Sequence, residues 1–181
     1  MQPAVRSVAF VRNIMVGRRG LTRDVLLDIF KSAGAEDTQS YITTGNFAFT
    51  ADRAAVAQVA ARIESAIEAV LGHREEAFIR SVDELRRLDQ SLPFSNEPVD
   101  LVRAVTFVPD GNTWTDELPY TSRRGDVRII GASGPNIFSS VLPVGGVAQS
   151  PIGLIEKALK VRATTRNWNT VERIIQAEAL R

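Results

Sequence analysis

Two short segments of the chain carry side chains that could bind an anion, and each stands where a helix is expected to begin. The first is Gly17-Arg18-Arg19-Gly20, between a predicted strand and a predicted helix, with Arg12 and Arg23 nearby. Guanidinium groups match carboxylates and phosphates in geometry, and the free N–H groups at a helix start attract negative charge. The segment lacks the glycine spacing of a dinucleotide-binding motif and the Gly-Lys-Ser/Thr ending of a P-loop. It predicts either an anion pocket or a solvated basic loop.

The second segment is a polar run around a tryptophan. Six polar residues surround Trp168 in the stretch Ala163-Thr164-Thr165-Arg166-Asn167-Trp168-Asn169-Thr170-Val171. A helix start needs only one polar residue to cap it, and this stretch offers Thr165, Asn167 and Asn169. Two interpretations stay open. The run is either an elaborate helix start with Trp168 in the core, or a polar site at a positive helix end with Arg166 directed at an anion.

Composition and spacing exclude most other chemistry. The 181 residues include no cysteine and one histidine, His73, which rules out thiol chemistry and multi-histidine metal centres. His73 follows a predicted helix end. A histidine in that place contacts helix carbonyls or solvent more often than it contacts the hydroxyl of a nucleophilic serine. The adjacent acidic pairs Asp83-Glu84 and Asp116-Glu117 do not share a helix face. We therefore expect no catalytic group, no cofactor and no bound metal.

The charge balance argues against strong attraction of a polyanion such as nucleic acid, and the short apolar segments argue against insertion into a membrane. Twenty-two basic and 21 acidic residues give a net charge of +1, so the chain has no global field that recruits nucleic acid. No apolar stretch approaches the roughly 20 residues that span a bilayer, and the first residues do not resemble a signal peptide. These features predict a cytoplasmic protein with no membrane partner, and they leave its oligomeric state open.

The apolar periodicity predicts an α+β protein made of two tandem subdomains of ferredoxin-like type. In the first, strands and helices follow the order β-α-β-β-α-β. Its strands are expected at residues 8–11, 38–42, 46–50 and 76–81, and its helices near residues 21–33 and 53–71. The second subdomain is a looser α+β unit. Its strands are expected at residues 101–108, 126–130 and 136–142, followed by a helix after Ser150-Pro151 and a final helix that carries Trp168. The proline-containing segment that ends at residue 98 separates subdomains 1–98 and 99–181.

Three motifs resemble the family catalogued as domain of unknown function 1697, from about Ser7 to about Ile175. The family's opening, roughly R-G-I-N-V-G-G, corresponds to Arg12-Asn13-Ile14-Met15-Val16-Gly17-Arg18. Its hairpin, roughly Y-x-x-S-G-N-x-x-F, corresponds to Tyr41-Ile42-Thr43-Thr44-Gly45-Asn46-Phe47-Ala48-Phe49. Its closing signature, A-T-T-R-N-W-N-T, is unchanged at residues 163–170. The resemblance implies a two-part α+β protein and no particular function.

The chain departs from the family's pattern at several positions. Asn13 replaces a glycine, Met15 replaces an asparagine and Arg18 replaces a second glycine. The family's Ser-Lys pair before a late helix stands here as Ser150-Pro151. If the family's site depends on that asparagine and that lysine, the ligand or activity of this protein differs from that of its relatives.

Three functions are compatible with these residues. The leading hypothesis is a non-catalytic binding module for an anionic ligand, either a phosphate-containing small molecule or weakly bound nucleic acid. The alternatives are a structural or regulatory protein with no ligand site, and an enzyme acting on a phosphorylated small molecule. The candidate ligand-binding residues are Arg12, Asn13, Gly17, Arg18, Arg19, Asn46, Thr165, Arg166, Asn167, Trp168 and Asn169.

Overall fold

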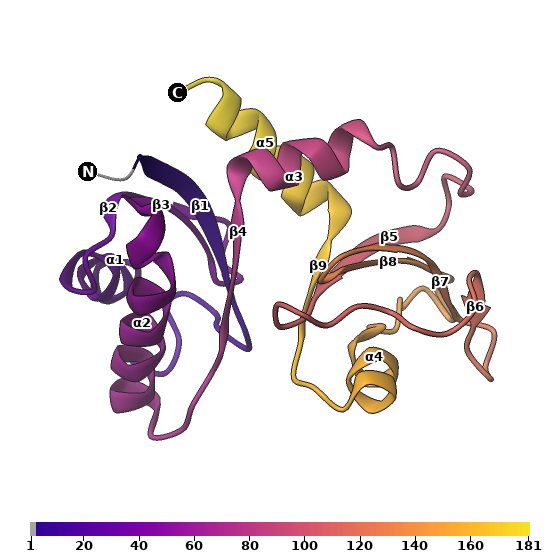
Figure 1. Ribbon diagram of the computed structural model, residues 1–181. Coiled ribbons are helices and arrows are strands. Elements are labelled where there is room, and N and C mark those ends of the chain that lie inside the picture. The colour runs from indigo at the N-terminus through magenta and orange to yellow at the C-terminus, as the bar shows by residue number, and fades with distance from the viewer. Residues whose placement is uncertain (1–2) are drawn as a thin grey trace. The chain divides into compact units, whose positions relative to one another are not determined.

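The computed structural model describes residues 3–181 and is a mixed α+β protein with two antiparallel sheets and five α-helices (Figure 1). The α+β class predicted from the sequence is therefore confirmed. The chain divides into two compact units, residues 1–84 and 85–181. Each unit is built around one of the two sheets.

The first unit contains four strands and two α-helices in the order β-α-β-β-α-β, as the apolar pattern predicts. They are β1 (Ala4–Val11), α1 (Arg23–Ser32), β2 (Glu36–Tyr41), β3 (Asn46–Asp52), α2 (Val56–Leu71) and β4 (Ala77–Ser81). A 3-10 turn, Arg53–Ala55, leads into α2. The strands lie in the order β2-β3-β1-β4, and each pairs antiparallel with its neighbour.

One face of this sheet carries the core of the first unit. Alternation along β3 places Phe47 and Phe49 on the same face, where α1 and α2 cover them (Figure 1). The ring of Phe30 in α1 lies 4.7 Å from that of Phe47 and 5.8 Å from that of Phe49, measured between centroids. Helix α2 ends at Gly72, whose φ of 76° is the left-handed conformation that glycine adopts at low cost.

Two loops at one end of this sheet pack against each other. The loop after β1 is joined to the β2–β3 turn by two backbone hydrogen bonds of 2.8 Å, from Val11 N to Gly45 O and from Val16 N to Thr43 O. Gly45 has a φ of 71°, and a Cβ atom there would stand 2.9 Å from the carbonyl oxygen of Val11. This position therefore requires glycine, and the turn fixes the course of the loop after β1.

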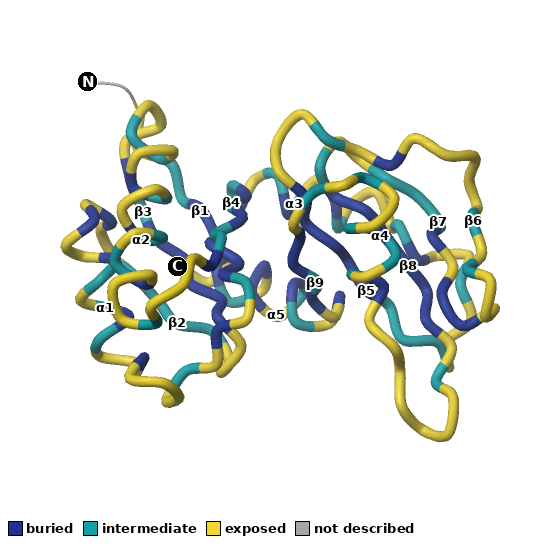
Figure 2. Tube along the Cα trace, turned by 90° about the horizontal axis from the view of Figure 1, so that it is seen from below, coloured by how far each residue is buried: buried dark blue, intermediate teal, exposed yellow. Residues whose placement is uncertain are grey.

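The second unit is a five-stranded sheet with helices on both faces (Figure 1). Its elements are β5 (Val102–Phe107), β6 (Tyr120–Thr121), β7 (Val127–Ser133), β8 (Asn136–Val141), α4 (Ile152–Leu159), β9 (Thr164–Asn167) and α5 (Trp168–Ala179). The strand order is β6-β7-β8-β5-β9. The central strand β8 is buried along its whole length and is dark blue throughout in Figure 2. Ile155 of α4 packs under Ile129 and Ile137, whereas Trp168 of α5 contacts Phe138 on the opposite face.

The division between the two compact units falls inside α3 (Val82–Gln90), between Glu84 and Leu85. The first residues after Glu84 pack on the rest of the second unit. Arg86 Nη2 donates a hydrogen bond of 3.2 Å to the carbonyl of Glu178, and the ring of Phe94 packs against those of Phe138 and Trp168. The proline-containing segment before residue 98 thus contributes an aromatic side chain to the second core.

The polar run before Trp168 forms a strand, which the sequence analysis did not predict. β9 pairs antiparallel with β5, with Thr164 opposite Phe107 and Arg166 opposite Val105. The helix begins only at Trp168, and the side chain of Asn167 caps it by accepting a hydrogen bond of 3.0 Å from the N–H of Asn169. Of the three candidate capping residues, Asn167 is the one that caps α5.

Candidate functional site

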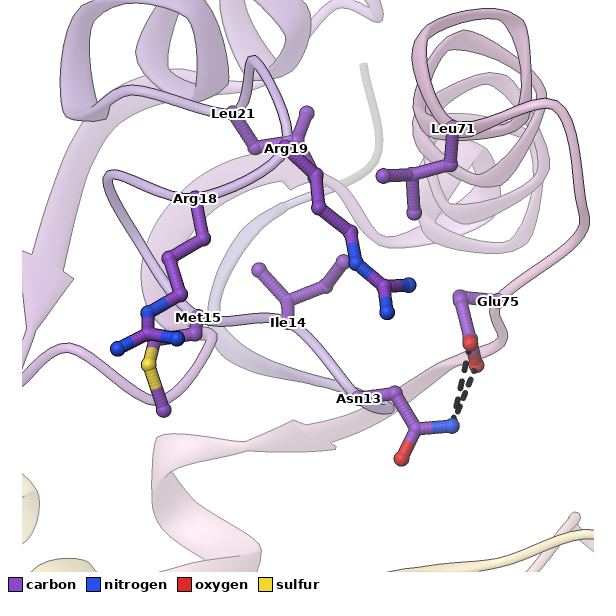
Figure 3. A pocket seen from close by; sticks show the side chains of 8 residues that line it. All are labelled: Asn13, Ile14, Met15, Arg18, Arg19, Leu21, Leu71 and Glu75. Carbon is purple, nitrogen blue, oxygen red and sulfur yellow. Dashed lines mark hydrogen bonds between the residues drawn. The ribbon is translucent and has the colours of Figure 1, made fainter.

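A pocket of about 400 Å³ lies in the first unit, between the loop after β1 and the C-terminal end of α2 (Figure 3). It contains three of the residues proposed from the sequence, namely Asn13, Arg18 and Arg19. The complete lining is Asn13, Ile14, Met15, Arg18, Arg19, Leu21, Leu71 and Glu75. The pocket thus combines two guanidinium groups, one carboxylate and four apolar side chains.

The loop after β1 closes on itself before α1 begins. Gly17, with a φ of 88°, donates its N–H to the carbonyl of Leu21 over 2.8 Å, and Leu21 donates its own N–H to the carbonyl of Arg18 over 3.0 Å. Thr22 then caps α1 by accepting a hydrogen bond of 3.3 Å from the N–H of Val25. Gly17 therefore shapes the loop, and the two arginines at its tip are exposed.

A buried carboxylate anchors the other side of the pocket. Glu75 is only 4% exposed, and Asn13 Nδ2 donates to both of its oxygens at 3.1 and 3.2 Å. Arg12 Nη1 lies 3.6 Å from Glu75 Oε2, and His73 Nε2 lies 3.4 Å from Oε1. A buried charge is tolerated when it is paired and hydrogen-bonded, so these neighbours account for the buried acid. Sequence reasoning did not select Glu75, since no local pattern distinguishes it from the neighbouring Glu76.

His73 is engaged by protein oxygens on both sides of its ring. Its Nδ1 lies 3.2 Å from the carbonyl oxygen of Leu71, at the end of α2, and its Nε2 faces Glu75. This is the helix-end environment expected from its place after Gly72, and it gives the ring a structural role beside the pocket.

Arg18 and Arg19 differ from Arg12 in their pairing. Within residues 3–181, neither of them forms an ion pair or a side-chain hydrogen bond, whereas Arg12 is paired with Glu75. Since the negative charge of Glu75 is matched by Arg12, the guanidinium groups of Arg18 and Arg19 give the pocket an excess of positive charge. Their fork-shaped donors are available to a ligand with negatively charged oxygens.

The three residues at which the loop departs from the family's opening motif all line the pocket. They are Asn13, Met15 and Arg18. Asn13 has a φ of 51°, in the left-handed region that glycine prefers and that asparagine tolerates better than most residues. The replacement of glycine is therefore compatible with the same backbone, and it adds the amide that binds Glu75.

Asn46 is fully buried and supports the neighbouring turn. Its Nδ2 donates to the carbonyl of Tyr41 and to Thr44 Oγ1, both over 3.1 Å. These bonds hold the turn whose Gly45 packs on the loop after β1. Asn46 is not among the residues that line the pocket, so it acts on the pocket only through the backbone.

The candidate residues of the second unit make contacts within that unit. Trp168 is 2% exposed, and its ring centroid lies 5.6 Å from that of Phe94 and 5.7 Å from that of Phe138. Arg166 is 9% exposed and donates from Nη1 to Thr164 Oγ1 over 2.7 Å and to the carbonyl of Thr165 over 2.9 Å. Burial lowers the pKa of Arg166 to about 10, which leaves the group charged at neutral pH.

The remaining polar residues of the closing motif are also engaged. Thr165 Oγ1 lies 2.8 Å from Thr106 Oγ1 on β5. Asn169 Oδ1 accepts a hydrogen bond of 2.8 Å from Arg103, while Asn167 caps α5. The burial of Trp168 and the cap at Asn167 agree with the interpretation of this run as a helix start with Trp168 in the core, although residues 164–167 form strand β9.

The part of the chain that the structure describes has neither a candidate metal cluster nor a candidate membrane span. Residues 3–181 contain no group of three or more histidine or acidic side chains placed to hold a metal ion. No helix in the same range has the length and apolar character needed to cross a bilayer.

Comparison with known proteins gives a family and a likeness to a solved structure. The search of curated proteins found no match. The solved structure titled "The structure of conserved bacterial protein SP0830 from Streptococcus pneumoniae" is similar over 97% of this chain and 98% of its own, with 20% sequence identity and a TM-score of 0.68. At that identity the likeness concerns the fold alone. The family described as "Protein of unknown function (DUF1697)" matches residues 5–131, and this chain belongs to that family.

Proposed function

We propose that this protein is a non-catalytic binding module for a small anionic molecule, held in the pocket of the first unit. The observation that carries the proposal is the pair of guanidinium groups of Arg18 and Arg19, which have no partner within residues 3–181 and line a pocket of about 400 Å³. The acidic side chain in the pocket, Glu75, is already paired with Arg12 and Asn13. That pairing supports a structural role for Glu75. It also favours ligand binding over proton transfer as the role of the pocket.

The size of the pocket favours a small molecule over nucleic acid. Its volume of about 400 Å³ lies toward the lower end of the roughly 300–1,000 Å³ typical of small-molecule sites. A hydrogen bond to a charged group contributes roughly 1.5–3 kcal/mol. Two such bonds, about 3–6 kcal/mol together, correspond to a dissociation constant on the order of 0.04–6 mM for an inorganic anion.

The experiment is isothermal titration calorimetry with inorganic pyrophosphate on the full chain and on Arg18→Ala, Arg19→Ala and the double variant. We expect each single variant to bind about tenfold more weakly, which corresponds to 1.4 kcal/mol, and the double variant to show no binding. Both arginines lack protein partners, so the melting temperature should not change. The matched control is Arg53→Ala, an exposed arginine of the same unit that does not line the pocket.

Two results would contradict the proposal. One is the absence of binding of pyrophosphate and phosphate by the unmodified protein at millimolar concentration. The other is an equal loss of binding in Arg53→Ala, which would mean that the anion responds to the general charge of the surface and not to this pocket.

A further inference from the structure

We infer that the ligand of this pocket is an amphipathic organic anion, with one phosphate or carboxylate group on an apolar body the size of a single ring. The inference rests on the proposed function, because Arg18 and Arg19 are taken to bind the anionic group. It adds a requirement that the guanidinium groups alone do not impose, namely an apolar part of the ligand that contacts the pocket wall.

The apolar half of the lining carries this inference. Four of the eight lining residues are apolar: Ile14, Met15, Leu21 and Leu71. Ile14 is 5% exposed and Leu21 is 1% exposed, and both belong to the core of the first unit. Because the core holds these side chains in place, the small part of their surface that faces the pocket is preformed and need not rearrange for a ligand.

Met15 completes the apolar wall from the solvent side. Met15 is 45% exposed and lines the pocket, so part of its apolar surface is accessible to a ligand. Figure 3 draws Met15, Ile14 and Arg18 among the side chains of one loop that line the pocket. A thioether makes favourable contacts with aromatic rings. An anion bound at Arg18 would therefore place its organic body against Met15 and Ile14.

The volume of the pocket favours an organic anion over an inorganic anion. A pocket of about 400 Å³ has room for several molecules the size of water, each of which takes up roughly 30 Å³ in the liquid. A bare phosphate at the arginines would leave the apolar wall in contact with water. A ring-sized body would remove on the order of 60–100 Å² of apolar surface from water, which corresponds to binding tighter by about 10- to 70-fold.

The test compares three probes that share one phosphate group: inorganic phosphate, glycerol 3-phosphate and phenyl phosphate. Calorimetry on the full chain should give phenyl phosphate at least about tenfold tighter binding than glycerol 3-phosphate. In Met15→Ser we expect phenyl phosphate to bind about threefold to fivefold more weakly, with glycerol 3-phosphate unchanged, because only the apolar contact is lost. The matched control is Leu142→Ser, since Leu142 is 47% exposed but lies outside the pocket lining.

Saturation-transfer NMR supplies a second measurement, which reports which ligand protons lie near methyl groups of the protein. Irradiation of the methyl groups of the protein should reach the ring protons of phenyl phosphate, and the transfer should weaken in Met15→Ser but not in Leu142→Ser.

The outcomes separate the two proposals. If phenyl phosphate and glycerol 3-phosphate bind equally, the inference about the apolar body is overturned while the anion site stands. If Met15→Ser and Leu142→Ser reduce phenyl phosphate binding equally, the apolar contact lies elsewhere and the inference is again overturned. If none of the three probes binds, the proposed function itself fails.

Discussion

Replacing Trp168 with alanine would remove an aromatic side chain from the core of the second unit. The indole is 2% exposed, and it contacts the rings of Phe94 and Phe138 at centroid distances of 5.6 and 5.7 Å. Truncation of a buried tryptophan costs about 3–5 kcal/mol. Each lost aromatic pair is worth about 0.5–1.5 kcal/mol beyond area burial, which favours the upper part of that range. Since domains are stable by only about 5–15 kcal/mol, Trp168→Ala should leave this unit close to unfolding.

Urea denaturation followed by circular dichroism measures this loss through the free energy of unfolding. Trp168→Phe serves as the matched variant, because it retains a ring between the same neighbours and should lose about half as much or less. A double-mutant cycle that combines Trp168→Ala with Phe94→Leu should give a coupling energy of about 1 kcal/mol between the two side chains. A loss below about 1 kcal/mol in Trp168→Ala, together with weaker binding of the anionic probes, would refute the core role and favour a ligand-stacking role instead.

Three further predictions concern the first unit. Gly45→Ala should lower the free energy of unfolding by roughly 2 kcal/mol or more, because the φ of 71° is unfavourable for alanine and the new Cβ would stand 2.9 Å from a backbone oxygen. An unchanged urea midpoint would contradict the packing of this turn. Ile42 is a β-branched residue with a φ of 59° and is 46% exposed, so Ile42→Gly should raise the free energy of unfolding by up to about 1 kcal/mol in the same assay. Binding of a labelled 20-mer DNA duplex should be weak, with a slope of log affinity against log salt no steeper than about −3. Of the arginines at the first polar segment (Arg12, Arg18, Arg19 and Arg23), only the last three are exposed and unpaired, so at most three phosphates would be neutralised. Tight binding that persists at high salt would contradict that electrostatic account.

The secondary structure of the first unit was predictable because its signals are local. Apolar residues recur at helical spacing in α2, and Gly72 ends that helix with a φ of 76°. The β2–β3 hairpin follows from two β-rich runs on either side of a glycine-containing turn. The order β-α-β-β-α-β could therefore be read from the chain. The strand ends differ by at most two residues, except that β1 begins at Ala4, four residues before its predicted start.

The second unit shows where local signals were insufficient. Strand β9 is a short polar segment at the edge of its sheet, and its partner β5 lies about 60 residues earlier in the chain, where Thr106 Oγ1 meets Thr165 Oγ1 across 59 positions. A polar edge strand has no apolar alternation to distinguish it from a helix cap. Likewise, the proline content around Phe94 indicated a linker, and only the tertiary structure reveals its ring between Phe138 and Trp168.

For the candidate site, the sequence by itself determined which residue types were available, and the tertiary structure decided which of them are free. Arg12, Arg18 and Arg166 are chemically equivalent in the sequence, yet one is paired with Glu75, one is exposed at a pocket and one is buried beside Thr164. The partner that makes this difference in the first unit, Glu75, is 62 positions from Asn13, to which it is hydrogen-bonded. Charge pairing and burial depend on distances in space and on the exclusion of water. Neither quantity is encoded in the spacing of residues along the chain, so the folded arrangement alone assigns the three arginines to different tasks.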